Sequence, residues 1–150
     1  MPPESDKKTI VIVEDDVAMR EIVAHKLLAS GFEVKEAEDG KAGIDLIIAT
    51  KPSLVLLDLM LPEVDGFKVL ETIRKHNDPQ VANTPIIILS NLWSNKDILK
   101  TKALHVQAYL VKAYFTTDEI LKKVQDVLAN PQKFAELSVN NQTGHPPINQ

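Results

Sequence analysis

The sequence contains no cysteine, so disulfide bonds and thiol chemistry are excluded, and the composition suits a reducing cytoplasm. Aromatic residues are few, at 5% of the chain. No apolar run approaches the roughly 20 residues that a membrane helix needs, and the polar N-terminus lacks the pattern of a signal peptide. We therefore expect a cytoplasmic protein that does not act at a membrane.

An excess of basic residues is also lacking. Lysine and arginine number 17 against 21 acidic residues, which gives a net charge of −4 and a pI of about 5.5. No overall positive field would attract nucleic acid, so we expect no direct nucleic-acid binding by this chain. The 44% apolar and 25% charged content of 150 residues is typical of one globular domain with a core.

Short apolar, β-branched segments alternate with segments of helical spacing. The predicted strands are Thr9–Val13, Phe32–Glu38, Leu54–Asp58, Pro85–Ser90 and Ala108–Lys112, and the predicted helices are Val17–Gly31, Gly40–Lys51, Gly66–His76, Asn95–Leu104 and Thr116–Asn130. This alternation predicts an α/β fold, a flavodoxin-like (βα)5 doubly wound parallel sheet with strand order 2-1-3-4-5. We expect residues 8–130 to form the domain and residues 131–150, rich in Asn, Gln and Pro, to be a flexible tail or a truncated linker.

Polar side chains follow four of the predicted strands. Glu14 and Asp15 follow the first strand, Asp58 ends the third, Ser90 ends the fourth and Lys112 ends the fifth. In an open parallel sheet the carboxyl ends of the strands form the ligand site, so these groups converge there. Crowded carboxylates repel one another unless a cation lies among them, and a set of oxygen ligands that binds phosphoryl oxygens suits Mg²⁺.

A carboxylate, a metal, an ammonium and a hydroxyl are the parts needed to receive a phosphoryl group. Asp58 is then the nucleophile that forms an aspartyl phosphate, assisted by Lys112 and Ser90. Taken alone, Asp58 would be interpreted as a turn residue or a helix cap. Its register with the other strand-end residues favours the catalytic interpretation.

Four motifs carry a family resemblance: "IVIVEDD", "LVLLDLMLPEVDG", "PIIILS" and "AYLVK". In this order and at this spacing they resemble the receiver domains of bacterial two-component response regulators, over roughly Lys8 to Leu128. The resemblance is to single-domain, chemotaxis-regulator-like members. It implies that Asp58 is the phosphoacceptor, that Asp15 is a direct Mg²⁺ ligand and Glu14 a ligand through water, and that the backbone carbonyl of Met60 is the remaining protein ligand.

The resemblance also implies a switch. Ser90 matches the hydroxyl that moves toward the phosphoryl group, Lys112 the lysine that pairs with it, and Tyr109 the aromatic residue that rotates inward on activation. A sensor histidine kinase or a phosphotransfer protein would donate the phosphoryl group. The surface of the fourth helix, fifth strand and last helix would then contact a downstream protein or form a homodimer.

The resemblance thus implies a phosphorylation-activated switch that is not an enzyme, apart from its own phosphoryl transfer and autodephosphorylation. Two alternatives remain open. One is a degenerate receiver that acts as a constitutive protein-interaction module. The other is a phosphatase that uses an aspartyl phosphate, which usually needs a second acid where this chain has Met60.

Three positions depart from the family pattern. Ala113 replaces the proline that usually follows the lysine, so either the bond is trans and Lys112 is aimed differently, or the site holds strain. Asn91 is bulkier than the usual residue after Ser90 and could change the lifetime of the phosphoryl bond. His105 and Val106 stand where Gly-Ala is common, so we expect the left-handed helix cap to be lost.

Overall fold

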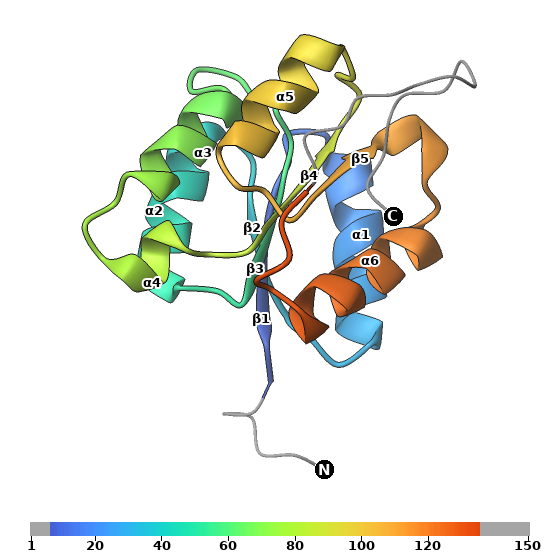
Figure 1. Cartoon of the computed structure of the whole chain (residues 1–150). Helices are drawn as coiled ribbons and strands as arrows, with labels where there is room; N and C mark the ends of the chain where they lie inside the picture. The colour runs from blue at the N-terminus through green and yellow to red at the C-terminus, as the bar shows by residue number, and fades with distance from the viewer. Residues whose placement is uncertain (1–6, 136–150) are drawn as a thin grey trace.

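Five parallel strands form one open sheet in the computed structural model, which describes residues 7–135 (Figure 1). The elements in chain order are β1 (Thr9–Val13), α1 (Val17–Ala29), β2 (Glu33–Ala37), α2 (Gly40–Thr50), β3 (Leu54–Leu57), α3 (Gly66–Arg74), α4 (Pro79–Ala82), β4 (Ile86–Ser90), α5 (Asn95–Ala103), β5 (Ala108–Val111), the 3-10 turn η2 (Lys112–Tyr114) and α6 (Thr117–Ala129). The strand order β2-β1-β3-β4-β5 confirms the predicted flavodoxin-like fold.

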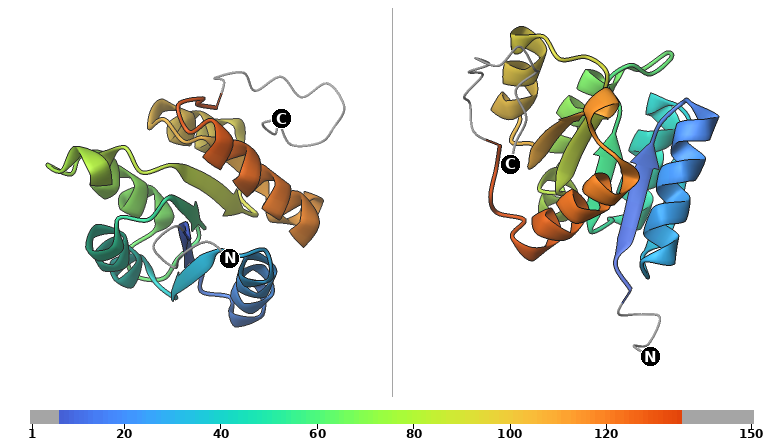
Figure 2. Two further views of the ribbon diagram at one scale, coloured as in Figure 1. Left: turned by 90° about the horizontal axis from the view of Figure 1, so that it is seen from below. Right: turned by 90° about the vertical axis from the view of Figure 1, so that its right-hand side faces the viewer.

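Alternate residues of the inner strands point to opposite faces of the sheet, and each face has its own core. Val11, Val55 and Ile88 belong to the cluster beneath α2, α3, α4 and α5. Their neighbours Ile10 and Leu54 belong to the cluster beneath α1 and α6. Figure 2, seen from below, shows α1 and α6 on one side of the sheet and α2 and α3 on the other. Because both faces are covered, the inner strands β1, β3 and β4 are almost continuously apolar.

Side-chain caps fix where the helices begin. Asp16 caps α1, since its carboxylate accepts a hydrogen bond from the Met19 N–H. Thr116 and Glu119 form a capping box at the start of α6. None of the helices in the described part of the chain is long and apolar enough to cross a bilayer.

Two short elements were not predicted. The four-residue helix α4 begins after Asp78, whose carboxylate accepts from the Gln80 N–H, and has Pro79 in its first turn. An Asp-Pro pair is a helix-start signal that the sequence did contain. The turn η2 takes Lys112 out of the fifth strand, which ends one residue earlier than predicted.

The side chain of Arg74, at the end of α3, joins the ends of α4 and α5. Its guanidinium donates to the carbonyls of Leu104 at 2.8 Å, His105 at 3.1 Å, Ala82 at 2.8 Å and Thr84 at 2.8 Å. Burial lowers the pKa of Arg74 to about 10, which leaves it charged at neutral pH. A cation is favourable here because helix carbonyl ends carry partial negative charge.

The expected loss of the left-handed cap after α5 is wrong. His105 takes the left-handed conformation itself, at φ 60°, and its N–H donates to the Lys102 carbonyl at 3.0 Å. A residue other than glycine pays roughly 1–2 kcal/mol for this conformation, which the bond from Arg74 to the His105 carbonyl helps to offset.

The predicted domain boundary at residue 130 stays a prediction. Residues 131–135 turn back after α6 and contact the segment just before β5, as described below. Residues 136–150 of the predicted tail lie outside the described residues.

Candidate functional site

The predicted polar residues meet at the carboxyl edge of the sheet. Strand β3 lies between β1 and β4, so Asp58 after β3 stands beside Glu14 after β1, and its N–H donates to the Val13 carbonyl at 3.0 Å. Asp58 and Glu14 are both buried, each with 4% of its surface exposed. Buried carboxylates are costly unless they are paired, so their partners decide what the site can do.

Lys112 is the cation between these acids. Its Nζ lies 2.7 Å from Asp58 Oδ2 and also pairs with Glu14 Oε1. The Lys112–Ala113 bond is trans, and the lysine still reaches both carboxylates. Of the two outcomes expected from the missing proline, the structure therefore has the trans bond, with the ammonium directed into the acid cluster.

Backbone groups hold both carboxylates in place. Asp58 Oδ1 accepts from the Met60 N–H at 3.0 Å, and Glu14 Oε2 accepts from the Asp16 N–H at 3.1 Å. Each carboxylate oxygen has two lone pairs, so these bonds orient the groups and leave capacity for a further ligand. The acids are thus preorganised by the loops after β1 and β3.

The charges in the cluster do not balance, because two buried carboxylates share one ammonium. Burial, with a smaller contribution from the Asp58 charge, raises the pKa of Glu14 to about 7 against the opposing effect of Lys112. Burial alone would lower the pKa of Lys112. The hydrogen bonds that Lys112 donates to Asp58 and Glu14 outweigh this effect, so the pKa of Lys112 is raised. The lysine is therefore firmly charged, and one more positive charge would be accommodated.

Asp15 completes the acidic group and is exposed beside the two buried acids. One carboxylate oxygen from each of Glu14, Asp15 and Asp58 lies within 4.8 Å of the others. With all three carboxylates ionised, the acids and the lysine carry a net charge of −2, and oxygen ligands are those that a hard divalent cation prefers. The residues present therefore fit Mg²⁺. The role of the Met60 carbonyl stays a prediction, although its loop position beside Asp58 is compatible with it.

Ser90 is fully buried at the end of β4, and its Oγ accepts from the Leu92 N–H at 3.3 Å. This bond leaves the hydroxyl proton for another acceptor. Ser90 thus lies at the same edge of the sheet as the acids, as predicted, and its role as switch hydroxyl stays a prediction.

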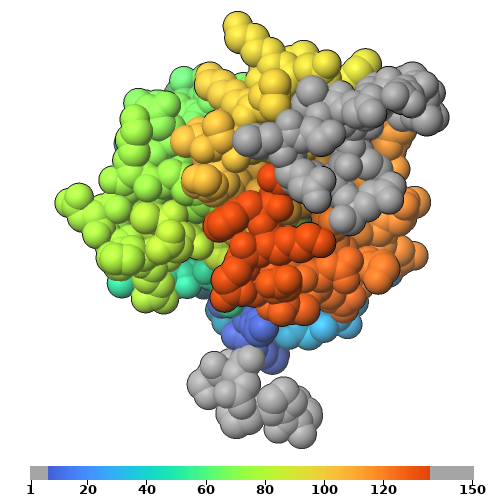
Figure 3. Space-filling model, viewed as in Figure 1, coloured from blue at the N-terminus to red at the C-terminus, as the bar shows by residue number. Residues whose placement is uncertain are grey.

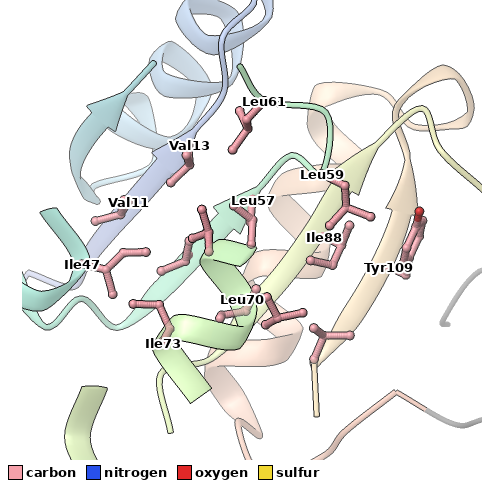
Figure 4. Close-up of a cluster of buried hydrophobic side chains, with 14 of the residues drawn as sticks. Val11, Val13, Ile47, Leu57, Leu59, Leu61, Leu70, Ile73, Ile88 and Tyr109 are labelled. Carbon is pink, nitrogen blue, oxygen red and sulfur yellow. The ribbon is translucent and has the colours of Figure 1, made fainter. Parts of the chain in front are cut away.

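Tyr109 points inward from β5, with no exposed surface, and packs beside Ile88 of β4 (Figure 4). Its hydroxyl donates to the carbonyl of Leu92, in the loop that follows Ser90. Burial raises the pKa of Tyr109, so the phenol stays protonated and can keep donating. The residue connects β5 to the loop at the site, which agrees with the predicted position of a switch residue; its rotation stays a prediction.

Sequence reasoning missed Arg20. Its Nη1 donates to the Glu14 carbonyl at 2.8 Å, and its Nε lies 3.3 Å from Glu36 Oε1 on β2. The guanidinium thus anchors the loop that carries Glu14 and Asp15. The available signal was an arginine in the second turn of the helix that follows the acids, but its partner Glu36 is remote in sequence and could not be identified.

The comparison with known families agrees with this geometry. Residues 10–125 match the family described as "Response regulator receiver domain". Among curated proteins, the chain is 32% identical over 133 residues to the "DNA-binding dual master transcriptional regulator RpaA" of Synechocystis, covering 89% of this chain and 54% of that protein. It is 34% identical over 128 residues to the "Probable transcriptional regulator ycf27" of Galdieria sulphuraria, covering 85% of this chain and 48% of that protein. The chain thus spans about half the length of these relatives.

Solved structures show the same fold. The chemotaxis protein CheY4 of Vibrio cholerae superimposes with a TM-score of 0.74 at 27% identity, covering 81% of this chain and 98% of that one. The receiver domain of the Francisella response regulator 1452 gives a TM-score of 0.74 at 28% identity, covering 83% and 99%.

Proposed function

The chain belongs to the response regulator receiver domain family, and from this membership we propose that it is a phosphorylation-activated switch in which Asp58 accepts a phosphoryl group. Receiver domains are phosphoacceptor switches of two-component signalling rather than conventional enzymes. The observation that carries the proposal is the buried Asp58 carboxylate between Lys112 and the acids Glu14 and Asp15.

Residues Glu14, Asp15 and Asp58, with the carbonyl of Met60, would hold Mg²⁺. The bound ion would supply positive charge beside the oxygens of the transferring phosphoryl group. The cluster's net negative charge supports this assignment.

In the transfer, an Asp58 carboxylate oxygen attacks the phosphorus of the donor. The new O–P bond forms as the bond to the donor nitrogen or oxygen breaks, and the leaving group keeps that electron pair. Lys112 lies 2.7 Å from the attacking carboxylate and pairs with the incoming phosphoryl oxygens, while Ser90 donates its hydroxyl proton to one of them. Water attack on phosphorus later returns the free carboxylate, and Asn91 beside Ser90 would influence how fast water arrives.

The proposed donor is a sensor histidine kinase or a phosphotransfer protein, and the proposed output is a downstream protein contacted through α5, β5 and α6. A homodimer through the same surface and a single-domain mode of action are further proposals. The curated relatives are named as transcriptional regulators, one of them as DNA-binding. For these 150 residues, whose net charge is −4, we propose no direct contact with nucleic acid. The cytoplasmic location expected from the sequence stays a prediction.

The alternative of a constitutive interaction module rests on the departures at Ala113 and Asn91. The contact of Lys112 with Asp58 and Glu14 supports the phosphoacceptor instead. Burying these three charged groups is unfavourable, and a module that only binds other proteins would not require them.

Intact-mass measurement with acetyl phosphate tests the proposal. The wild type should gain one phosphoryl group in Mg²⁺ and none in a chelator, and Asp58→Asn should gain none in either. Asp65→Asn is the matched control, because Asp65 caps α3 and asparagine caps helices equally well. A folded, Mg²⁺-binding wild type that gains no mass would favour the constitutive module, and a gain in Asp58→Asn would place the acceptor elsewhere.

A further inference from the structure

The two edge strands of the sheet are protected in different ways. β2 carries Glu33, Lys35 and Glu36, which are exposed and charged. Charged side chains on an edge strand oppose its pairing with a strand of another chain. β5 has the sequence Ala-Tyr-Leu-Val, which is uncharged and needs another form of protection.

The hydrogen bonds of β5 show which backbone groups face outward. Gln107 donates its N–H to the Ile86 carbonyl of β4 at 2.9 Å. The register places Ala108 opposite Ile87, and the bond from the Val55 N–H to the Pro85 carbonyl directs Ile87 toward β3, so Ile86 and Ile88 face β5. Ala108 and Leu110 therefore bond β4, and Tyr109 and Val111 direct their N–H and C=O groups away from it. Just before β5, the Val106 carbonyl points away from β4, opposite to the Gln107 N–H, and accepts a hydrogen bond from the Ala135 N–H at 2.9 Å.

Ala135 belongs to a five-residue segment, Pro131–Ala135, which we call the C-terminal strap. After α6 the chain turns through a hydrogen bond from the Lys133 N–H to the Asn130 carbonyl at 3.2 Å. The strap then turns back to the segment just before β5, and Figure 3 shows its red atoms between α5 (gold) and α6 (orange).

Three consecutive residues just before β5, His105, Val106 and Gln107, contact the strap. The Phe134 ring lies against the His105 ring with 5.2 Å between centroids, and Val106 accepts from Ala135. The buried Gln107 donates its Nε2–H to the Pro131 carbonyl at 3.0 Å, while its Oε1 accepts from the N–H that begins β4 at 2.7 Å. The strap is therefore held by a site built from backbone, amide and ring contacts, and Ala135 packs on the core cluster.

We propose that the C-terminal strap is an edge guard, which docks at the entrance to β5 within its own chain, between α5 and α6, and prevents the outer edge of β5 from pairing with an extended strand of a second copy. The uncharged edge of β5, the charged edge of β2 and the strap's bond to an outward carbonyl carry this inference. The guard acts without phosphorylation and is independent of the function proposed above.

The strap contains its own reporter, because the exposed Lys133 is a trypsin site. A docked segment is cleaved only through its released form, so the cleavage rate measures the released population. The unphosphorylated 150-residue chain is compared with Phe134→Ala/Ala135→Pro, which removes the ring and the donor, and with His105→Gly, which removes the partner ring where the backbone φ of 60° suits glycine. Gln132→Ala, an exposed change within the strap, is the matched control.

We expect both strap-releasing variants to be cut after Lys133 about tenfold faster than the wild type, since each loses ring or hydrogen-bond contacts. Their apparent Kd for self-association in sedimentation should fall by at least the same factor, because only the released form can pair. Amide exchange at Tyr109, whose N–H faces outward, should slow as their concentration rises, whereas Gln132→Ala should match the wild type throughout.

Several results would overturn the edge guard. Equal cleavage of the wild type and both variants would show that the strap is not docked. Faster cleavage without stronger association would show that the strap does not prevent pairing, and association without slower exchange at Tyr109 would place the contact elsewhere. Protection of Lys133 that grows with wild-type concentration would mean that the strap is exchanged between copies.

Discussion

Replacing Glu14 with glutamine should stabilise the metal-free protein at high pH, although the change removes an ion pair with Lys112. Glu14 and Asp58 are both buried and share that one ammonium. Burial raises the pKa of Glu14 from 4.5 to about 7, so the ionised form is disfavoured in the folded protein. Glutamine is neutral at every pH and can still accept the Asp16 N–H through its amide oxygen.

The sign and size of the stability difference between Glu14→Gln and the wild type follow from proton linkage. Between pH 4.5 and about 7 the folded chain holds a proton on Glu14 that the unfolded chain has lost, so the free energy of unfolding falls as pH rises. The difference of about 2.5 between the two pKa values corresponds to about 3 kcal/mol. Because this net shift already includes the contact with Lys112, we expect Glu14→Gln to be more stable than the wild type by about 3 kcal/mol at pH 8 and by almost nothing at pH 4.

Urea unfolding in a chelator at several pH values from 4 to 8 measures this difference. Glu38→Gln, an exposed acid just after β2, is the control and should show no such trend. In excess Mg²⁺ the wild type should gain more stability than Glu14→Gln, because the cation compensates the second buried carboxylate. A stability difference that does not change with pH, or a variant less stable than the wild type at pH 8, would refute the reasoning from unbalanced charge.

Three other substitutions test single contacts by urea unfolding. Arg74→Met should lower the free energy of unfolding by about 3–5 kcal/mol, because four carbonyls lose their donor, and a loss under 1 kcal/mol would mean that water replaces it. Lys112→Met should cost about 3–5 kcal/mol at pH 8 in a chelator and clearly less at pH 5, where Glu14 is protonated; an equal loss at both pH values would contradict the charge assignment. Tyr109→Phe should cost about 1 kcal/mol for the bond to Leu92, and unchanged stability would show that the hydroxyl is not needed to hold that loop.

The fold and the strand-end acids could be predicted because both depend on short-range patterns. Segments such as Leu54–Leu57 are apolar on both faces, which occurs when a parallel strand is covered on both sides. Once the strand order was inferred, the position of Asp58 beside Glu14 followed from adjacency of β1 and β3. The sequence did not predict which acid Lys112 would contact, because a flexible four-carbon side chain has many reachable positions.

What the sequence did not predict depends on contacts between remote segments. The rest of α1 and the loop before β2 separate Arg20 from its partner Glu36 in the sequence, and Arg74 donates to carbonyls up to 31 residues away. Every residue type has a backbone carbonyl, so the sequence pattern cannot predict which carbonyls an arginine side chain will bind. The same holds for Ala135, whose bond to the Val106 carbonyl uses backbone atoms alone.

Position 105 keeps the left-handed backbone conformation although histidine stands where glycine is common in the family. Glycine would take the left-handed conformation at no steric cost, whereas histidine pays roughly 1–2 kcal/mol for it. That cost is met here by the N–H bond to Lys102, the bond from Arg74 and the ring contact with Phe134. The first two bonds use backbone atoms and would survive in His105→Gly, whereas the ring contact would not. This variant therefore separates the two roles of the residue: the turn after α5 should be as stable or more so, while the strap should lose its hold at the entrance to β5.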